Sequence, residues 1–224
     1  MTALRQIVLA SGNAGKLREF AALLAPLGLD LVAQSALGVP AADEPFETFL
    51  ENALAKARHA SRLTGRAALA DDSGICVDAL GGRPGVRSAR WALVRAADDT
   101  GAGSNADAPE NTDAANNARL VADLASCPDR SASYYCVLVL VRAPDDPRPI
   151  VADASWPGEV IDAPRGAAGF GYDPHFLIPS LDRTVAELDA QTKNRLSHRG
   201  RAMRALVERL REEHVLPGAA QGLR

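Results

Sequence analysis

Short apolar runs that alternate with helical stripes restrict the fold of this chain more than any other feature. Residues 6–10 (QIVLA) and 29–33 (LDLVA) are apolar runs of strand length. Between them, residues 17–27 repeat leucine or phenylalanine every three or four positions, which is the period of one face of a helix. Strands that alternate with helices along a chain predict an α/β fold.

The same alternation continues toward the C-terminus. Residues 133–142 and 149–154 are two strand-like runs joined by a short polar segment, as in a hairpin. One hairpin among crossover connections makes the expected sheet mixed rather than all parallel. The other expected elements are strands over 67–70, 75–80 and 158–161, helices over 48–64, 113–125 and 195–214, and a glycine-rich loop over 166–174.

The composition adds that the core must be aliphatic. The 224 residues include 43 alanines but only ten aromatic side chains. This length suits one domain or one two-lobed unit, which we expect to span 1–216, followed by a tail over 217–224. Residues 95–111 are rich in small and polar residues and show no periodicity, so we expect an inserted flexible loop there.

Charge and cysteine usage exclude several classes of protein. A formal net charge of −3 lacks the broad basic surface of a general nucleic-acid binder, although it leaves room for a local anion pocket. The three cysteines form no C-x-x-C pair and the four histidines no H-x-x-x-H pair, which argues against a disulfide framework and a zinc site. The apolar runs are too short for a signal peptide or a membrane span, so we expect a soluble, cytoplasmic protein without nucleic-acid or membrane partners.

The first candidate site is the segment Ser-Gly-Asn-Ala-Gly-Lys at 11–16, between the first expected strand and helix. Backbone N–H groups at a helix N-terminus bind phosphate, and glycines let the backbone approach it. A Walker P-loop needs four residues between its first glycine and Gly-Lys, whereas two separate Gly12 from Gly15, and Leu17 replaces the required hydroxyl residue. The segment therefore fits either a phosphate loop of another kind or a tight turn that caps a helix.

The second candidate is the pair of acids Asp71 and Asp72, at the end of an expected strand. Sheets of α/β proteins bind ligands at the carboxyl ends of their strands, and carboxylates are the oxygen ligands that Mg²⁺ prefers. If the strand continues, the two side chains point to opposite faces, so one would face the ligand and the other would be structural. Asp-Asp-Ser-Gly is also a common solvated turn. Glu44 could supply a second carboxylate, although no spacing rule requires it.

Lysines and aromatic residues supply two further signals. The chain has only three lysines, Lys16, Lys56 and Lys193, which suit point-charge contacts to phosphate or simply lie on helix surfaces. The segment Phe170–Asp173 places two of the ten aromatic residues in a glycine-rich loop beside a carboxylate. Such a loop could stack on a nucleotide base and hold its edge, although taken alone it fits a hydrophobic anchor better.

Seven segments taken together and in order resemble the inosine triphosphate pyrophosphatase family over nearly the whole chain. They are SGNAGK (11–16), FLENALAKARHA (49–60), ADDSG (70–74), GGRPGVRSARW (81–91), SWPG (155–158), GFGYDP (169–174) and SHRG (197–200). The resemblance implies a three-layer α/β/α fold with a mixed, twisted sheet and two lobes flanking a cleft. It also implies a Mg²⁺-dependent homodimer that hydrolyses ITP, dITP and XTP to the monophosphate and pyrophosphate.

The resemblance also implies a role for each matching residue. Asp72 matches the catalytic acid, and Glu44 and Asp72 match the metal ligands. The implied substrate contacts are Ser11, Gly12, Asn13, Ala14, Gly15 and Lys16 in the phosphate loop, Lys56 and Lys193 near the phosphates, Ser73, and the base-pocket residues Phe170, Gly171, Tyr172, Asp173, His198 and Arg199. The main departure from the family is a longer stretch over 92–111. A catalytically silent nucleotide sensor could use the same pocket, but retention of both Glu44 and Asp72 argues against it.

Overall fold

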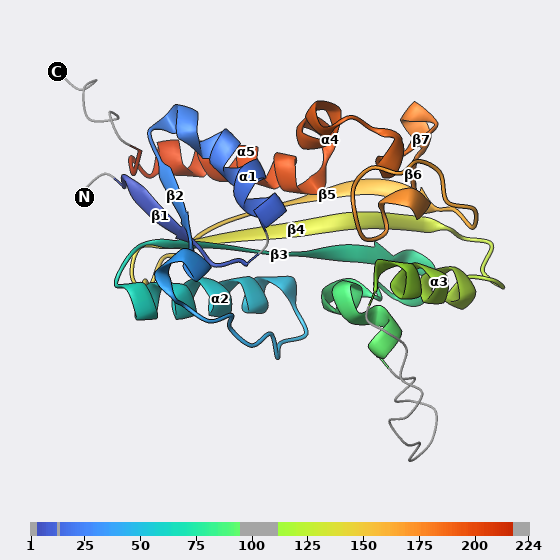
Figure 1. Cartoon of the computed structure of the whole chain (residues 1–224), viewed down its shortest axis with the longest axis horizontal. Helices are drawn as coiled ribbons and strands as arrows, with labels where there is room; N and C mark the ends of the chain where they lie inside the picture. The colour runs from blue at the N-terminus through green and yellow to red at the C-terminus, as the bar shows by residue number, and fades with distance from the viewer. Residues whose placement is uncertain (1–3, 13, 95–111, 217–224) are drawn as a thin grey trace, which may run out of the picture. The chain divides into compact units, whose positions relative to one another are not determined.

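The computed structural model describes residues 4–12, 14–94 and 112–216, which form a mixed seven-stranded sheet flanked by helices (Figure 1). The strand order is β2-β1-β3-β4-β5-β6-β7. The strands are β1 (Gln6–Leu9), β2 (Asp30–Ala33), β3 (Ala68–Val77), β4 (Ser131–Val141), β5 (Ile150–Val160), β6 (Phe176–Ile178) and β7 (Arg183–Thr184). The expected α/β class with a mixed sheet is therefore confirmed.

The α-helices lie between these strands and after the last of them. They are α1 (Ala14–Leu24), α2 (Phe49–Thr64), α3 (Asp113–Asp123), α4 (Ala190–Leu196) and α5 (His198–Glu212). Short 3₁₀ helices span Ala25–Leu27, Gln34–Leu37, Asp78–Leu80, Gly85–Leu93, Asp173–His175, Pro179–Leu181 and Val185–Glu187. No helix among the described residues is long and apolar enough to cross a membrane.

Strand pairing explains the mixed sheet. Strand β1 runs parallel to both β2 and β3, with Val8 level with Val32 and Ala68. Strand β6 runs antiparallel to both β5 and β7. The Val160 N–H donates to the Arg130 carbonyl, which places the end of β5 beside the start of β4, as the predicted hairpin requires.

The chain divides into two compact units, and strands β3, β4 and β5 contribute residues to both. Unit 1 comprises residues 1–73, 136–154 and 198–224, and unit 2 comprises residues 74–135 and 155–197.

Unit 1 has the layered arrangement that the sequence predicts. Phe20 and Leu24 of α1 and Met203 and Leu206 of α5 share one buried apolar cluster with strand residues such as Leu69. Helix α2 lies on the opposite side of the strands (Figure 1). Half of the buried residues of α2 are alanines, namely Ala53, Ala57 and Ala60, whose small side chains let the helix approach the sheet closely.

Local signals set the ends of α2 where the sequence places them. The Thr48 hydroxyl accepts a hydrogen bond from the Glu51 N–H, which satisfies one of the free donors at the helix N-terminus. Gly65 ends the helix with φ of 66°, a left-handed conformation that glycine adopts without steric cost.

Unit 2 has a different kind of core. Its buried cluster includes five of the ten aromatic residues of the chain, whereas the buried cluster of unit 1 includes only Phe20. The expectation of an aliphatic core is therefore confirmed for unit 1, whereas in unit 2 nine aliphatic side chains share the buried cluster with the five aromatic ones. The aromatic members in unit 2 are Trp91, Tyr134, Trp156, Tyr172 and Phe176.

Several predicted boundaries are wrong. Residues 67–70 and 75–80 do not form two strands, because β3 continues through Asp71–Gly74. Residues 158–161 are not a separate strand, because β5 extends to Val160. The helix expected over 195–214 is two helices, since Ser197 has the extended backbone angles φ −66° and ψ 158°. The loop predicted over 95–111 and the tail predicted over 217–224 lie outside the described residues.

Candidate active site

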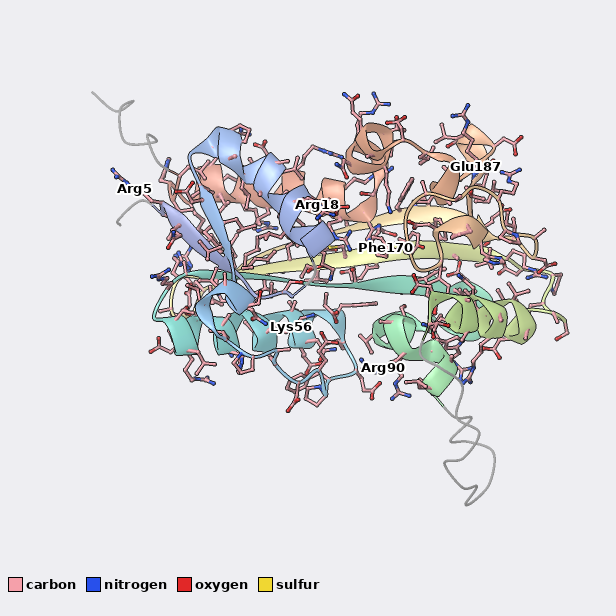
Figure 2. The ribbon with its side chains drawn as sticks, in the orientation of Figure 1. Arg5, Arg18, Lys56, Arg90, Phe170 and Glu187 are labelled. Carbon is pink, nitrogen blue, oxygen red and sulfur yellow. The ribbon has the colours of Figure 1, made fainter. Side chains whose placement is uncertain are left out.

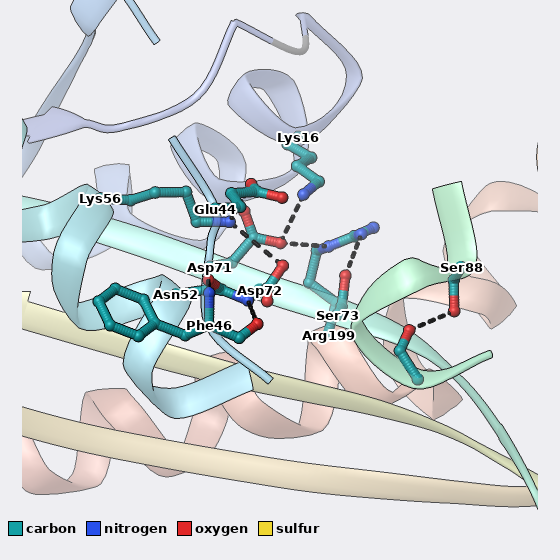
Figure 3. Close-up of polar contacts among 11 residues, drawn as sticks. Lys16, Glu44, Phe46, Asn52, Lys56, Asp71, Asp72, Ser73, Ser88 and Arg199 are labelled. Carbon is teal, nitrogen blue, oxygen red and sulfur yellow. Dashed lines mark hydrogen bonds and ion pairs between the residues drawn. The ribbon is translucent and has the colours of Figure 1, made fainter. Parts of the chain in front are cut away.

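Asp71 and Asp72 lie in the middle of β3 rather than at its end, which corrects the position that the sequence predicts. Because successive side chains of a strand alternate between the faces of the sheet, the two acids meet different helices. Asp71 contacts Lys16 of α1 and Arg199 of α5, and Asp72 contacts Lys56 of α2 (Figure 3). The prediction that the two acids separate to opposite faces is therefore confirmed.

Asp71 is the centre of a buried ion network. Its side chain is 1% exposed, and its Oδ2 lies 2.8 Å from Lys16 Nζ and 3.7 Å from Arg199 Nε. Burial opposes its ionisation, but the charges of Lys16 and Arg199 outweigh burial and lower the pKa of Asp71 to about 2. This acid is a permanent anion that compensates two cations.

Arg199 connects that network to its neighbours. Its Nη1 donates to Glu19 Oε2 at 3.0 Å, and its Nη2 donates to Ser73 Oγ at 3.4 Å. Burial would lower the pKa of Arg199, but the surrounding charges, Asp71 first among them, raise it. The guanidinium of Arg199, assigned to the base pocket by resemblance, is thus engaged with acids and a hydroxyl of unit 1.

Glu44 and Asp72 share a single cation on the other face of β3. Lys56 Nζ, on α2 (Figure 2), donates to Glu44 Oε1 at 2.9 Å and to Asp72 Oδ1 at 3.2 Å. Burial raises the pKa of Asp72 and Glu44 adds to this, while Lys56 opposes it; the net direction is upward. Burial would lower the pKa of Lys56, but the carboxylates around it, Asp72 first among them, outweigh burial and raise it.

The arrangement of Glu44 and Asp72 suits a divalent cation. Both carboxylates are within reach of one ammonium group, and Asp72 Oδ2 is buried yet accepts no hydrogen bond from any described residue. Mg²⁺ is usually held by one or two carboxylates together with water and substrate phosphates. Within 4–12, 14–94 and 112–216, no group of three or more His, Cys, Asp or Glu side chains is placed to hold a metal ion. Glu44 and Asp72 fit magnesium.

The phosphate-loop candidate leads from β1 into α1. Apart from its chain neighbours, no described atom would lie within 4 Å of a Cβ added at Gly12, so there is open space beside the backbone there. The first turn of α1 contains no acidic residue, which leaves the positive end of the helix dipole uncompensated. The side chain of Lys16, the third residue of α1, is 20% exposed. Asn13 lies outside the described residues.

Asp173 organises the Phe170 loop in unit 2. Its Oδ2 accepts hydrogen bonds from Lys193 Nζ at 2.6 Å and from the Phe170 N–H at 3.0 Å, and its Oδ1 accepts one from the Tyr134 hydroxyl at 3.2 Å. Lys193 Nζ also lies 4.7 Å from the centre of the Phe170 ring, within the range of a cation–π contact. Asp173 thus holds an aromatic ring and a cation together.

Phe170 and Tyr172 differ in exposure although they lie two residues apart. Phe170 is 51% exposed, as a stacking platform must be. Tyr172 is buried, and its hydroxyl donates to the Ser88 carbonyl at 2.8 Å, so its side chain anchors the loop. Gly171 is bonded through its backbone to Asp113 and Asn117 of α3.

Gly169 is required by the same loop. Its φ is +83°, and a Cβ there would lie 2.0 Å from Asp173 Oδ2. Any other residue at this position would be strained and would displace the carboxylate that holds Phe170 and Lys193.

The structure gathers the predicted site residues into two groups, one in each unit. Unit 1 holds Ser11, Gly12, Gly15, Lys16, Glu44, Lys56, Asp72, Ser73, His198 and Arg199, and unit 2 holds Phe170, Gly171, Tyr172, Asp173 and Lys193. The residues that the sequence analysis missed are Glu19, Asn52 and Tyr134. For Asn52 there was a signal, since an amide four residues before Lys56 falls on the same helix face.

Comparison with known proteins gives a consistent result. The model of the Ham1 family matches residues 7–209. A dITP/XTP pyrophosphatase of Ralstonia nicotianae is 63% identical over 208 residues, which cover 93% of this chain and 98% of the relative. Another from Nitrosomonas europaea is 53% identical over 214 residues, covering 96% of this chain and 98% of the relative.

Solved structures resemble the chain over similar lengths. A HAM1 protein from Coxiella burnetii superposes with a TM-score of 0.81 at 44% identity, covering 95% of this chain and all of that one. The Ham1 protein of Staphylococcus aureus gives a TM-score of 0.78 at 34% identity, covering 93% of this chain and 99% of that one.

Proposed function

Because this chain belongs to the Ham1 family, we propose that it is a nucleoside triphosphate pyrophosphatase that removes non-standard purine nucleotides such as dITP, ITP and XTP. Its relatives are named dITP/XTP pyrophosphatases and align with nearly its whole length. The observation that carries the proposal is the pair of carboxylates, Glu44 and Asp72, that converge on one cation beside a buried oxygen without a hydrogen bond.

In the proposed reaction, a water oxygen bonds to the α-phosphorus while the bond from that phosphorus to the bridging oxygen of pyrophosphate breaks. Glu44 and Asp72 would hold Mg²⁺, which supplies charge neutralisation for the phosphates and orientation for the attacking water. Asp72 would accept the proton of that water, a role that suits a carboxyl whose pKa is raised by burial. The products are a nucleoside monophosphate and pyrophosphate.

The cations of unit 1 would stabilise the phosphates. Charge in the transition state spreads over the phosphoryl oxygens, so positioned cations and backbone N–H groups carry much of the catalysis. Lys16 and the N-terminal turn of α1 provide such groups, and Lys56 already sits between the two carboxylates. Asp71 would hold Lys16 and Arg199 in place without itself reacting.

The Phe170 loop would bind the base. The exposed face of Phe170 offers a stacking surface. Lys193, which the resemblance places near the phosphates, lies beside this ring, so we propose that its N–H donors reach the base instead. Hypoxanthine and xanthine carry a keto oxygen at position six, which accepts from such donors, whereas adenine carries an amino group there. We retain His198 and Arg199 as further base contacts, as the resemblance implies.

We also propose that the protein is a cytoplasmic homodimer whose only substrates are small nucleotides, and that residues 1–216 act as one two-lobed domain. The net charge of −3 supports the exclusion of nucleic acid as a partner. Light scattering of the purified protein tests the dimer directly.

The function is tested by measuring pyrophosphate release from ITP, dITP, XTP, GTP and ATP with and without Mg²⁺. We expect release from ITP, dITP and XTP that depends on Mg²⁺, with ATP and GTP poor substrates. Tight binding of ITP without any release of pyrophosphate would identify a nucleotide sensor instead. Equal rates on all five nucleotides would contradict the assignment of the Phe170 loop to base selection.

A further inference from the structure

One face of α2 holds the segment 40–46 in place through three side chains. Asn52 bonds the backbone of Phe46, Lys56 bonds the carboxylate of Glu44, and His59 bonds the carbonyl of Pro40. The three helix residues are spaced by four and then three positions, which places them on one face of the helix. As α2 proceeds, its partners move backward along the segment, so the two run in opposite directions.

Asn52 makes the most specific of these contacts. Its Oδ1 accepts from the Phe46 N–H at 3.1 Å and its Nδ2 donates to the Phe46 carbonyl at 3.0 Å, as a neighbouring strand would (Figure 3). The side chain is 0% exposed. A buried amide whose two ends pair with one residue's backbone fixes both the position and the orientation of that residue.

These contacts matter because Glu44 lies in a segment without regular structure. Residues 39–46 belong to no helix or strand, so the ladder hydrogen bonds of a sheet do not fix them. The Glu44 side chain is 33% exposed, and its ion pair with Lys56 acts through the flexible four-carbon chain of the lysine. Asn52 anchors the backbone two residues after Glu44, and His59 anchors it four residues before.

We propose that Asn52 is a positioning residue that places Glu44 for metal binding, with His59 as a weaker second anchor. Neither touches the substrate; both act through the backbone of the segment 40–46. The proposal rests on the proposed function, because that function makes Glu44 a metal ligand. Groups that orient metal ligands typically change metal affinity or activity by about 10–100-fold when they are removed.

The experiment compares Asn52→Ala and His59→Ala with a matched control, Ser61→Ala. Ser61 is equally buried on α2, but its hydroxyl donates to the Arg66 carbonyl at the other end of the helix. Three quantities are measured: amide hydrogen exchange of the peptide covering 40–48 in the metal-free protein, Mn²⁺ affinity by electron paramagnetic resonance, and the Mg²⁺ dependence of pyrophosphate release from ITP.

For Asn52→Ala we expect faster exchange in 40–48 and Mn²⁺ affinity weaker by about 10-fold or more. The half-saturating Mg²⁺ concentration should rise by a similar factor, while kcat at saturating Mg²⁺ stays near that of the wild type. His59→Ala should shift the same quantities in the same direction by less. Ser61→Ala should lower the melting temperature without changing exchange in 40–48 or metal affinity.

Unchanged exchange and unchanged Mn²⁺ affinity in folded Asn52→Ala would overturn the proposal. If Asn52→Ala does not fold, His59→Ala decides: unchanged exchange and metal affinity in that variant would also overturn it. A wild-type protein that binds no Mn²⁺ and needs no Mg²⁺ would contradict the proposed function instead. The exchange measurement would then still show whether Asn52 fixes the segment.

Discussion

The two units of this protein bury different kinds of side chain. Unit 1 surrounds charged side chains with an aliphatic core, and each buried acid of β3 has its own cation, Lys16 for Asp71 and Lys56 for Asp72. Unit 2 buries aromatic rings and uses polar contacts to hold one further ring, Phe170, at the surface. A buried charge is costly unless it is paired, whereas a single exposed ring carries little cost on a protein surface. The difference matches the two ends of a nucleotide, one charged and one flat and apolar.

The largest expected effect comes from a substitution in unit 1, and it tests the contrast between the two units. Asp72→Asn should lower kcat about 10²–10⁴-fold because the amide neither accepts a proton nor binds a cation as a carboxylate does. The melting temperature should change little, since burial disfavours the charged form of Asp72. Steady-state pyrophosphate release at saturating Mg²⁺ measures the effect. A kcat near that of the wild type would move the catalytic role to Asp71.

Asp71→Asn should affect stability instead. Removing one partner from a buried ion pair costs about 3–5 kcal/mol, because the remaining charge is left without compensation. Denaturant unfolding of the variant and of Asp72→Asn side by side measures the contrast. If Asp71→Asn unfolds at the wild-type denaturant concentration, the description of Asp71 as a structural ion is wrong.

The same acid predicts how stability depends on pH. Its folded-state pKa of about 2 lies below the ordinary value of 3.8, so its contribution is complete above about pH 4. The contribution is lost as pH falls from about 4 toward 2, where the folded state also takes up the proton. Unfolding measured across this range should show a steeper loss for the wild type than for Asp71→Asn. Parallel curves would contradict the ion network.

Phe170→Ala tests unit 2. Loss of a stacking surface costs about 1–3 kcal/mol per base, so KM for ITP should rise roughly 5- to 150-fold with a smaller change in kcat. The protein should remain as stable as the wild type, because the ring is half exposed. A fall in kcat at unchanged KM would show that the ring does not bind the base.

Tyr134→Phe should have the smallest effect. It removes one hydrogen bond to Asp173, worth about 0.5–1.5 kcal/mol, and leaves the bonds from Lys193 and Phe170 in place. We expect a small rise in KM for ITP and a slightly lower melting temperature. Titration calorimetry with a non-hydrolysable ITP analogue measures the first, and a loss as large as that of Phe170→Ala would make Tyr134 more than a supporting residue.

The sequence was most informative where a local signal agreed with the packing. Thr48 and Gly65 predicted the ends of α2 because each acts on the helix terminus directly. The segment Asp71–Gly74 was expected to lie at a strand end or to form a solvated turn, since Asp and Gly are depleted in strands. The strand continues because Lys16 and Lys56, distant in sequence, compensate the acids from either side. Pairing of this kind has no local signature.

The candidate site shows the same limit. The sequence predicted Asp72, Glu44 and Phe170 as site residues, from the chemistry of their side chains and from the resemblance to a known family. Tyr134 was not predicted, because a hydroxyl gains a role only from the partner that folding places beside it. For Asn52 the one signal was its position on the same helix face as Lys56, which does not reveal its partner Phe46. In the fold, strands β6 and β7 were missed because segments of three and two residues are too short to show the apolar–polar alternation of a strand.

Asp71 and Asp72 point to opposite faces of the sheet, and this also restricts insertions and deletions in β3. Insertion or deletion of one residue in β3 ahead of Asp71 would turn every following side chain to the other face of the sheet. The acid that compensates Lys16 and Arg199 would then face Glu44, and the acid that faces Glu44 would enter the opposite layer. Such a change leaves the composition almost untouched yet abolishes the site. A change of two residues would keep the faces but shift both acids along the strand by about 6.6 Å, away from their cations.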